Sequence, residues 1–142
     1  MPYEYLDHTA DLGLRATGAT PQEALSEAAQ AMLAAMADTT SIREKATFEQ
    51  QCHATDVPAL LVEWLNELLY QREVNDVLFA SACVTELRQQ EDGTWVLNGI
   101  AKGEPLDPDR HQLHTEIKGA TYYGLQFECA ADRCVIQCVL DV

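Results

Sequence analysis

Two segments of the chain carry apolar residues at helical spacing. The first begins at Thr20, which can cap a helix with Glu23 three residues on, and its pattern continues to about Asp38. The second begins at Asp56 and is expected to fray by about Arg72. The first stripe is rich in alanine and methionine, which is typical of a helix face packed on a sheet: Leu25, Ala28, Ala29, Met32, Leu33 and Met36.

Alternating apolar and polar positions predict several strands around these helices. An Asp92-Gly93 turn joins two of them into a hairpin, and 104–113 is expected to be a loop because it is polar and holds two prolines. The order of elements predicts an α+β fold, with two helices packed on a mixed or antiparallel β-sheet in a single domain over 1–142. The predicted strands are 3–6, 12–16, 42–52, 77–89, 94–102, separate strands starting near 117 and at 125–129, and 135–140.

The charge of the chain narrows the classes of partner. Nine Lys and Arg against 23 Asp and Glu give a net charge of −14. Such a surface repels phosphate backbones, so we expect no stable direct binding of nucleic acid, whereas cations or a basic protein suit it. Acidity that serves solubility alone is the alternative. The chain shows no signal peptide and no apolar run long enough for a membrane helix, which predicts a cytoplasmic protein without membrane contact.

Five cysteines occur without a C-x-x-C pair. Cys129 and Cys134 flank a turn and could face each other across a hairpin. In a reducing cytosol we interpret all five as small apolar core residues, with a disulfide or a soft-metal site as the alternative. The other three are Cys52, Cys83 and Cys138.

The stretch DHTAD crowds polar groups near the N-terminus. It places Asp7, His8, Thr9 and Asp11 at a junction between two predicted strands. Burying a core does not require such a cluster. Either the carboxylates cap local backbone, or they hold a ligand.

The sequence ends in VLDV, where Asp141 adjoins Val142 at the end of a predicted strand. The side-chain carboxylate of Asp141 and the terminal carboxylate of Val142 repel one another unless a cation or hydrogen-bond donors hold them. Together with Asp11 they make a set of hard oxygen ligands, which favours calcium, magnesium or manganese over zinc or copper. The alternative is that Asp141 is simply solvated.

No motif in the sequence supports an enzyme. A phosphate-binding loop and a nucleophile elbow are both absent, and His111 and His114 have no further ligands at zinc spacing. A metal-dependent phosphohydrolase built on Asp11 and Asp141 is the weakest reading, because the net charge repels the substrate.

Four motifs in order resemble the archease family along the whole length of the chain. They are DHTADLGL near the N-terminus, GEPLD at 103–107 with His111 after it, EIKGATYYGL at 116–125, and the final VLDV. The third departs from the family pattern: Gly119 and Ala120 stand where the family has a bulkier pair, and Tyr123 stands where it has a histidine.

The resemblance implies an accessory protein rather than a catalyst. Archease-like proteins promote guanylylation of the GTP- and metal-dependent ligase of tRNA splicing and RNA repair, so that it turns over repeatedly. The family's divalent-metal site, seen with calcium, maps onto Asp11, Asp141 and Val142. Asp7, His8 and Thr9 are expected to support the loop. A general chaperone or modulator of DNA- or RNA-processing proteins is the alternative function.

Overall fold

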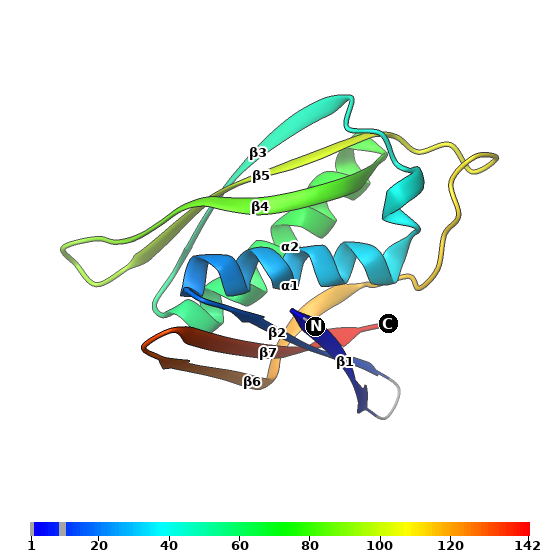
Figure 1. Cartoon of the computed structure of the whole chain (residues 1–142). Helices are drawn as coiled ribbons and strands as arrows, with labels where there is room; N and C mark the ends of the chain where they lie inside the picture. Colours follow the sequence, from blue (N-terminus) through cyan, green and yellow to red (C-terminus); the bar gives the residue numbers. More distant parts are fainter. Residues whose placement is uncertain (1, 9–10) are drawn as a thin grey trace.

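Two helices lie between two antiparallel sheets, so the molecule has three layers (Figure 1). The structure, a computed structural model, describes residues 2–8 and 11–142, with Asp7 and His8 described by their backbone. Helix α1 (Pro21–Met36) packs on β2 and β4, whereas α2 (Val57–Asn75) packs on β3 and β6. Each helix therefore contacts both sheets.

The strands form one four-stranded and one three-stranded sheet. The first has the order β1 (Tyr3–His8), β2 (Asp11–Gly18), β7 (Arg133–Asp141), β6 (Gly119–Ala130). The second has the order β3 (Ala46–Ala54), β5 (Trp95–Pro105), β4 (Val77–Gln89). Every pair is antiparallel, which confirms the α+β prediction and selects the antiparallel alternative.

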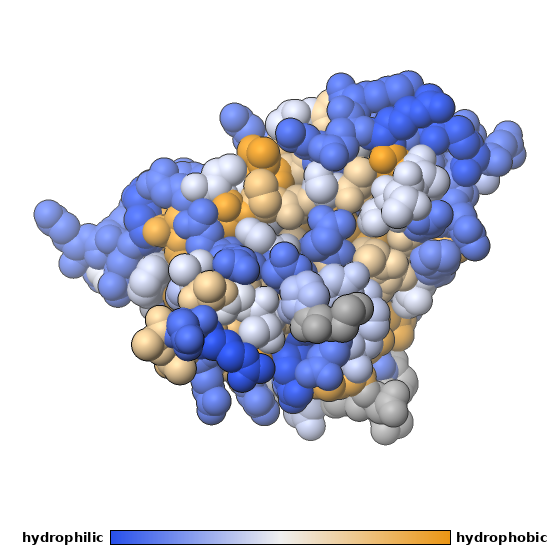
Figure 2. Space-filling view, viewed as in Figure 1, coloured by the Kyte–Doolittle hydropathy of each residue, from blue (hydrophilic) through white to orange (hydrophobic). Residues whose placement is uncertain are grey.

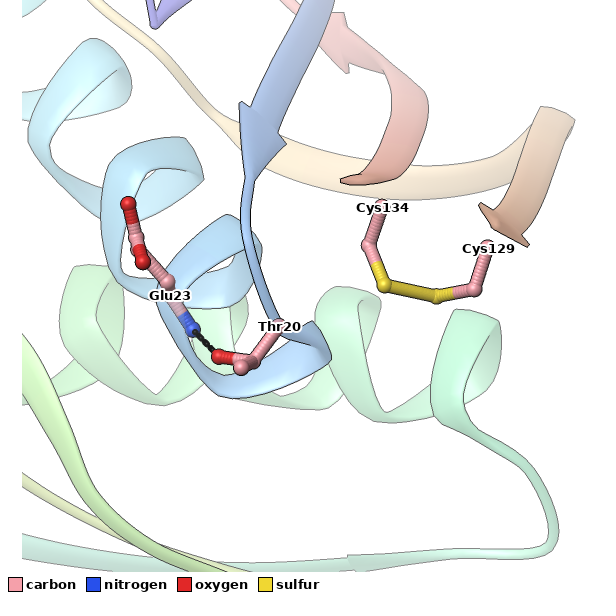
Figure 3. Close-up of a disulfide and its surroundings, with 4 residues drawn as sticks. All are labelled: Thr20, Glu23, Cys129 and Cys134. Atoms are coloured by element: carbon pink, nitrogen blue, oxygen red, sulfur yellow. Dashed lines mark hydrogen bonds between the residues drawn. A yellow bond between two sulfur atoms is a disulfide. The ribbon is translucent and has the colours of Figure 1, made fainter. Parts of the chain in front are cut away.

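Helix α1 begins as the sequence predicts. The Thr20 hydroxyl accepts a hydrogen bond from the Glu23 amide at 3.1 Å, as Figure 3 shows. The helix ends at Met36, two residues earlier than the pattern suggests, because Ala37 turns into an extended conformation and pairs with Leu113. Its buried surface is also wider than one stripe, since Ala24 and Ala31 are fully buried too. A helix between two sheets buries two faces.

Helix α2 is capped by Asp56, whose side chain accepts from the Ala59 amide at 2.8 Å. It runs to Asn75 and so extends three residues beyond the predicted fraying point, ending where Asp76 adopts a φ of 52°. Trp64 ties the helices together, because its buried indole N–H donates to the Leu25 carbonyl of α1 at 3.1 Å. A Cβ on Gly99 would lie 2.5 Å from the Trp64 ring, so β5 needs glycine there.

The strand predictions need correction at β3 and at β6. The hairpin of β4 and β5 is confirmed, but β3 starts at Ala46 rather than near residue 42, because Thr39–Ser41 forms a 3₁₀ turn first. The two separate strands expected near 117 and 125 are one edge strand, β6. Its register with β7 shifts between Thr121 and Gln126. This irregular stretch is where the alternating sequence pattern breaks off, and for that reason the pattern suggests two strands.

The interpretation of the cysteines was wrong for three of the five. Cys129 and Cys134 form a disulfide across the hairpin of β6 and β7, because its two-residue turn places them directly opposite each other, with Cα atoms 4.1 Å apart (Figure 3). Cys83 is exposed. Cys52 and Cys138 are buried as expected, and burial raises the pKa of each thiol to about 12.

The surface in view in Figure 2 carries both polar and apolar side chains. The face drawn in Figure 2 is largely hydrophilic, with smaller apolar areas between the polar groups. Within residues 2–8 and 11–142, neither helix is long and apolar enough to cross a membrane.

Candidate functional site

The fold brings Asp11 and Asp141 together from opposite ends of the sequence. Strand β7 inserts beside β2 in the four-stranded sheet (Figure 1), and the register makes Asp11 and Asp141 direct partners. His8 of β1 pairs with Asp11 on one side, and Gly119 of β6 pairs with Asp141 on the other. These positions form one row across the end of the sheet.

Alternation along the strands decides which way the two carboxylates face. Leu12 and Leu140 are the next pair, and Leu140 is fully buried against the helices. Asp11 and Asp141 therefore project from the opposite, outer face. Asp11 is half-buried and Asp141 is exposed.

Two carboxylates directly opposite each other in an antiparallel pair repel and destabilise the sheet. A divalent cation between them would reverse the sign of that interaction. Carboxylate oxygens suit calcium, magnesium or manganese, so the donor chemistry of Asp11 and Asp141 fits the implied metal. These two residues would hold it together with a third ligand.

Val142 follows directly on Asp141 and packs against the core with its side chain partly buried. Among the residues that the structure describes, no three His, Cys, Asp or Glu side chains gather at one point. Asp11 and Asp141 thus supply two side chains, and a carboxylate at Val142 is the third ligand that the resemblance implies. Thr9 and the side chains of Asp7 and His8 lie outside the described residues, so their supporting role stays a prediction.

The start of β6 borders this row. The Lys118 amide donates to the Asp141 carbonyl at 2.8 Å. Asn66 of α2 holds the next residues, because its side chain accepts from the Ala120 amide at 2.8 Å and donates to the Ala120 carbonyl at 3.1 Å. Tyr123, in the histidine position of the family pattern, is 71% exposed within the interrupted part of β6.

The GEPLD motif, unlike the aspartate pair, places its glutamate carboxylate in the interior. Glu104 is only 2% exposed at the end of β5. Its carboxylate forms an ion pair with Arg110 and accepts from the Arg43 amide at 2.7 Å and from His111 Nε2 at 3.0 Å. The hydrogen bond from Arg110, followed by those from Arg43 and His111, lowers the pKa of Glu104 to about 2. Glu104 is therefore an ionised structural anchor, and we name these contacts the Glu104 lock.

His111 completes the Glu104 lock from inside the 106–118 segment. Its Nδ1 accepts from the Asp107 amide at 3.0 Å, so the proton of the neutral ring lies on Nε2 and points at Glu104. The ring is fully buried. This arrangement fixes the segment that leads to Lys118 and β6.

Sequence reasoning missed the Glu104 lock as a physical unit. GEPLD and His111 were recognised only through the family resemblance, and His111 was weighed as a zinc ligand. The available signal was the presence of a glutamate and a histidine seven residues apart in a polar loop, but spacing alone does not show that both are buried.

Comparison with known proteins identifies the family. The model of the archease protein family matches residues 3–142. This chain belongs to the archease family. It is 37% identical over 142 residues to protein archease of Methanopyrus kandleri, covering 100% of both chains. It is 39% identical over 140 residues to protein archease of Methanosarcina acetivorans, covering 99% of this chain and 95% of that one.

Two solved structures of similar fold support the architecture of this archease chain. The solution structure of protein 1598 of Methanobacterium thermoautotrophicum matches with a TM-score of 0.82 and 25% identity over 99% of both chains. The crystal structure of an archease and possible chaperone from Thermotoga maritima matches with a TM-score of 0.61 and 19% identity, covering 98% and 96% of the chains. The second likeness shows the fold alone.

Proposed function

We propose that this archease is an accessory protein that activates a GTP- and metal-dependent RNA-splicing ligase by promoting its guanylylation. Membership of the archease family over residues 3–142 supports the proposal of an accessory protein. The choice of an RNA-splicing ligase as the partner comes from the sequence resemblance. In this proposal the chain performs no catalysis of its own.

The observation that carries the proposal is the register of Asp11 opposite Asp141 on an outer sheet face. Like charges in that position repel each other, and a divalent cation held between them would turn the repulsion into attraction. We propose that Asp11, Asp141 and Val142 hold a divalent cation, calcium first, with magnesium or manganese as alternatives. When bound, such a cation neutralises phosphate charge in nucleotidyl transfer.

Charge supports a ligase as the partner. An enzyme that binds RNA presents a basic face, and a chain with a net charge of −14 is attracted to it over long range. The same charge disfavours binding of RNA by the archease itself. We propose a cytoplasmic complex between the two proteins.

The test is single-turnover and multiple-turnover guanylylation of a cognate ligase with limiting enzyme and excess RNA. The native chain is compared with Asp11→Asn and Asp141→Asn, which keep side-chain volume but lose charge. Asp132→Asn is the matched control, because Asp132 is exposed in the turn at the other end of β7. Stimulation should be lost in the first two variants and kept in the control.

The outcomes separate the parts of the proposal. Stimulation by all variants would keep the activator and remove the metal mechanism. No stimulation by the folded native chain would instead favour a general modulator of nucleic-acid-processing proteins, which predicts binding to several basic clients.

A chain extended beyond Val142 tests the third ligand. Two added glycines move the terminal carboxylate away from Asp141 while leaving both aspartates in place. Calcium affinity by calorimetry should fall at least about tenfold, as expected when one ligand of a hard-oxygen site is removed. Unchanged affinity would remove Val142 from the site.

A further inference from the structure

A pocket of about 570 Å³ lies where the C-terminal ends of α1 and α2 meet residues 113–118. In Figure 1 residues 106–118, yellow to orange, run from the end of β5 past the end of α1 to β6. Met36, Leu69 and Ile117 supply apolar lining. The volume is that of a site for a small organic molecule.

The pocket concentrates basic groups in a chain that has few. Arg72, His114 and Lys118 line it together with Glu73 and Glu116, although the whole chain holds only nine Lys and Arg against 23 Asp and Glu. Within the described part of the chain, the side chains of Arg72 and Lys118 have no hydrogen-bond or ion-pair partner. Four other basic side chains each have a carboxylate within ion-pair distance: Arg15, Lys45, Arg88 and Arg110.

Arg72 carries a further sign of a missing partner. Its Nε atom is buried and has no acceptor among the described residues. A buried donor without an acceptor costs free energy, and few remain in folded proteins. An anion in the pocket would offer acceptors to the guanidinium.

The walls of the pocket are fixed before any ligand enters. The amides of His114 and Thr115 donate to the carbonyls of Met36 and Ala35 at 2.9 and 3.1 Å. These bonds satisfy two carbonyls at the end of α1. The Lys118 amide is held by Asp141 at 2.8 Å. A site with fixed backbone loses little entropy on binding.

We propose that this pocket binds a small phosphorylated molecule, with Arg72 and Lys118 holding the phosphate and the apolar lining contacting its organic part. A guanidinium matches phosphate oxygens with two parallel hydrogen bonds, and a lysine adds a point charge. A long polyanion is disfavoured, because its remaining phosphates would face the acidic surface. A single phosphate group feels mainly the local cations, since charge is screened within about 8 Å at physiological salt.

The inference stands apart from the ligase and from the metal. It is tested by NMR titration of the labelled native chain with sodium pyrophosphate and with a nucleoside triphosphate, in the absence of divalent ions. We expect saturable shifts of the amide signals of 113–118. Arg72→Met and Lys118→Met, which keep the apolar stems, should each weaken pyrophosphate binding about tenfold, as loss of a charged hydrogen bond does.

Three further variants sharpen the result. Lys102→Met removes a lysine of β5 outside the pocket lining and should leave binding unchanged. Glu73→Gln removes a carboxylate from the pocket lining and should tighten binding about twofold. Asp132→Asn, in the turn at the far end of β7, should leave pyrophosphate binding unchanged. The readout needs neither a ligase nor a divalent ion, so that failure of this inference and failure of the ligase proposal remain distinguishable.

The proposal is overturned if pyrophosphate shifts signals across the whole surface, or if Lys102→Met weakens binding as much as Lys118→Met. It is also overturned if neither probe saturates in the millimolar range. A single-stranded RNA without terminal phosphate that displaces pyrophosphate from 113–118 would assign the pocket to RNA instead.

Discussion

Glu104 lies buried among three donors, whereas Asp11 and Asp141 lie opposite one another on the outer face of a sheet. All three are carboxylates in stretches that carry the family resemblance. The surroundings of Glu104 neutralise its charge and so use it for structure. Asp11 and Asp141 instead place two carboxylates opposite each other on an outer face, which is an arrangement expected of a binding site.

The largest expected effect is the loss of the stabilising contacts of Glu104 at acidic pH. The pKa of Glu104 is lowered from 4.5 to about 2, so its stabilising contacts are fully present above pH 4.5 and are lost as the pH falls towards 2. Urea unfolding of the native chain and of Glu104→Gln should therefore differ strongly at pH 6 and converge near pH 2. A constant difference across that range would show that the ion pair does not stabilise the fold.

Removing the partner of Glu104 should cost nearly as much. His111→Ala leaves a buried cavity and removes a hydrogen bond to a charged group, which together lower the free energy of unfolding by about 3 kcal/mol. Chemical denaturation measures this loss. Asp109→Ala in the same segment is exposed and should change stability by less than about 0.5 kcal/mol.

Calcium should stabilise the fold only through the aspartate pair. At a concentration about 100 times the dissociation constant, a ligand bound by the native state alone raises the free energy of unfolding by about 2.7 kcal/mol. Thermal unfolding with calcium and with a chelator should show this increase for the native chain and not for Asp141→Asn. An equal increase in both would place the ion elsewhere.

Reduction of the disulfide tests whether the far end of β7 matters to Asp141. Opening a loop of this length should cost roughly 2 kcal/mol by the chain-entropy relation. Unfolding with and without a thiol reductant measures that loss. Calcium affinity should not change, because Cys134 and Asp141 lie at opposite ends of β7.

The smallest expected effect is a gain in stability, whereas the disulfide and Glu104 variants lose stability. Without metal, Asp141→Asn removes a like-charge pair and should raise the free energy of unfolding by about 0.5 kcal/mol. The measurement is denaturation in the presence of a chelator. A clear loss of stability instead would mean that Asp141 serves the fold, and the contrast with Glu104 would disappear.

Local signals in the sequence were sufficient for the helices and for the longest hairpin. Thr20 and Asp56 cap the two helices because a short polar side chain can accept from an amide three residues on. The Asp92-Gly93 turn joins β4 and β5 because glycine tolerates the φ of 90° found there. These interactions involve neighbours in the chain, so periodicity and turn chemistry are enough to predict them.

Contacts between distant segments needed the tertiary structure. No pattern in the sequence separates the two sheets or reveals that α1 is buried on two faces. The disulfide could be named only as an alternative for Cys129 and Cys134, and the Glu104 lock was not predicted, because burial is not a function of spacing.

The sequence by itself determined the donor chemistry of the proposed metal site, since carboxylates are hard ligands wherever they lie. Only the tertiary structure decided that Asp11 meets Asp141. Residues 130 positions apart become partners because β7 inserts between β2 and β6, and the pairing register is set by which residues face the helices. A slip of one residue would place Leu140 in solvent, so the burial of the core holds the two carboxylates in line.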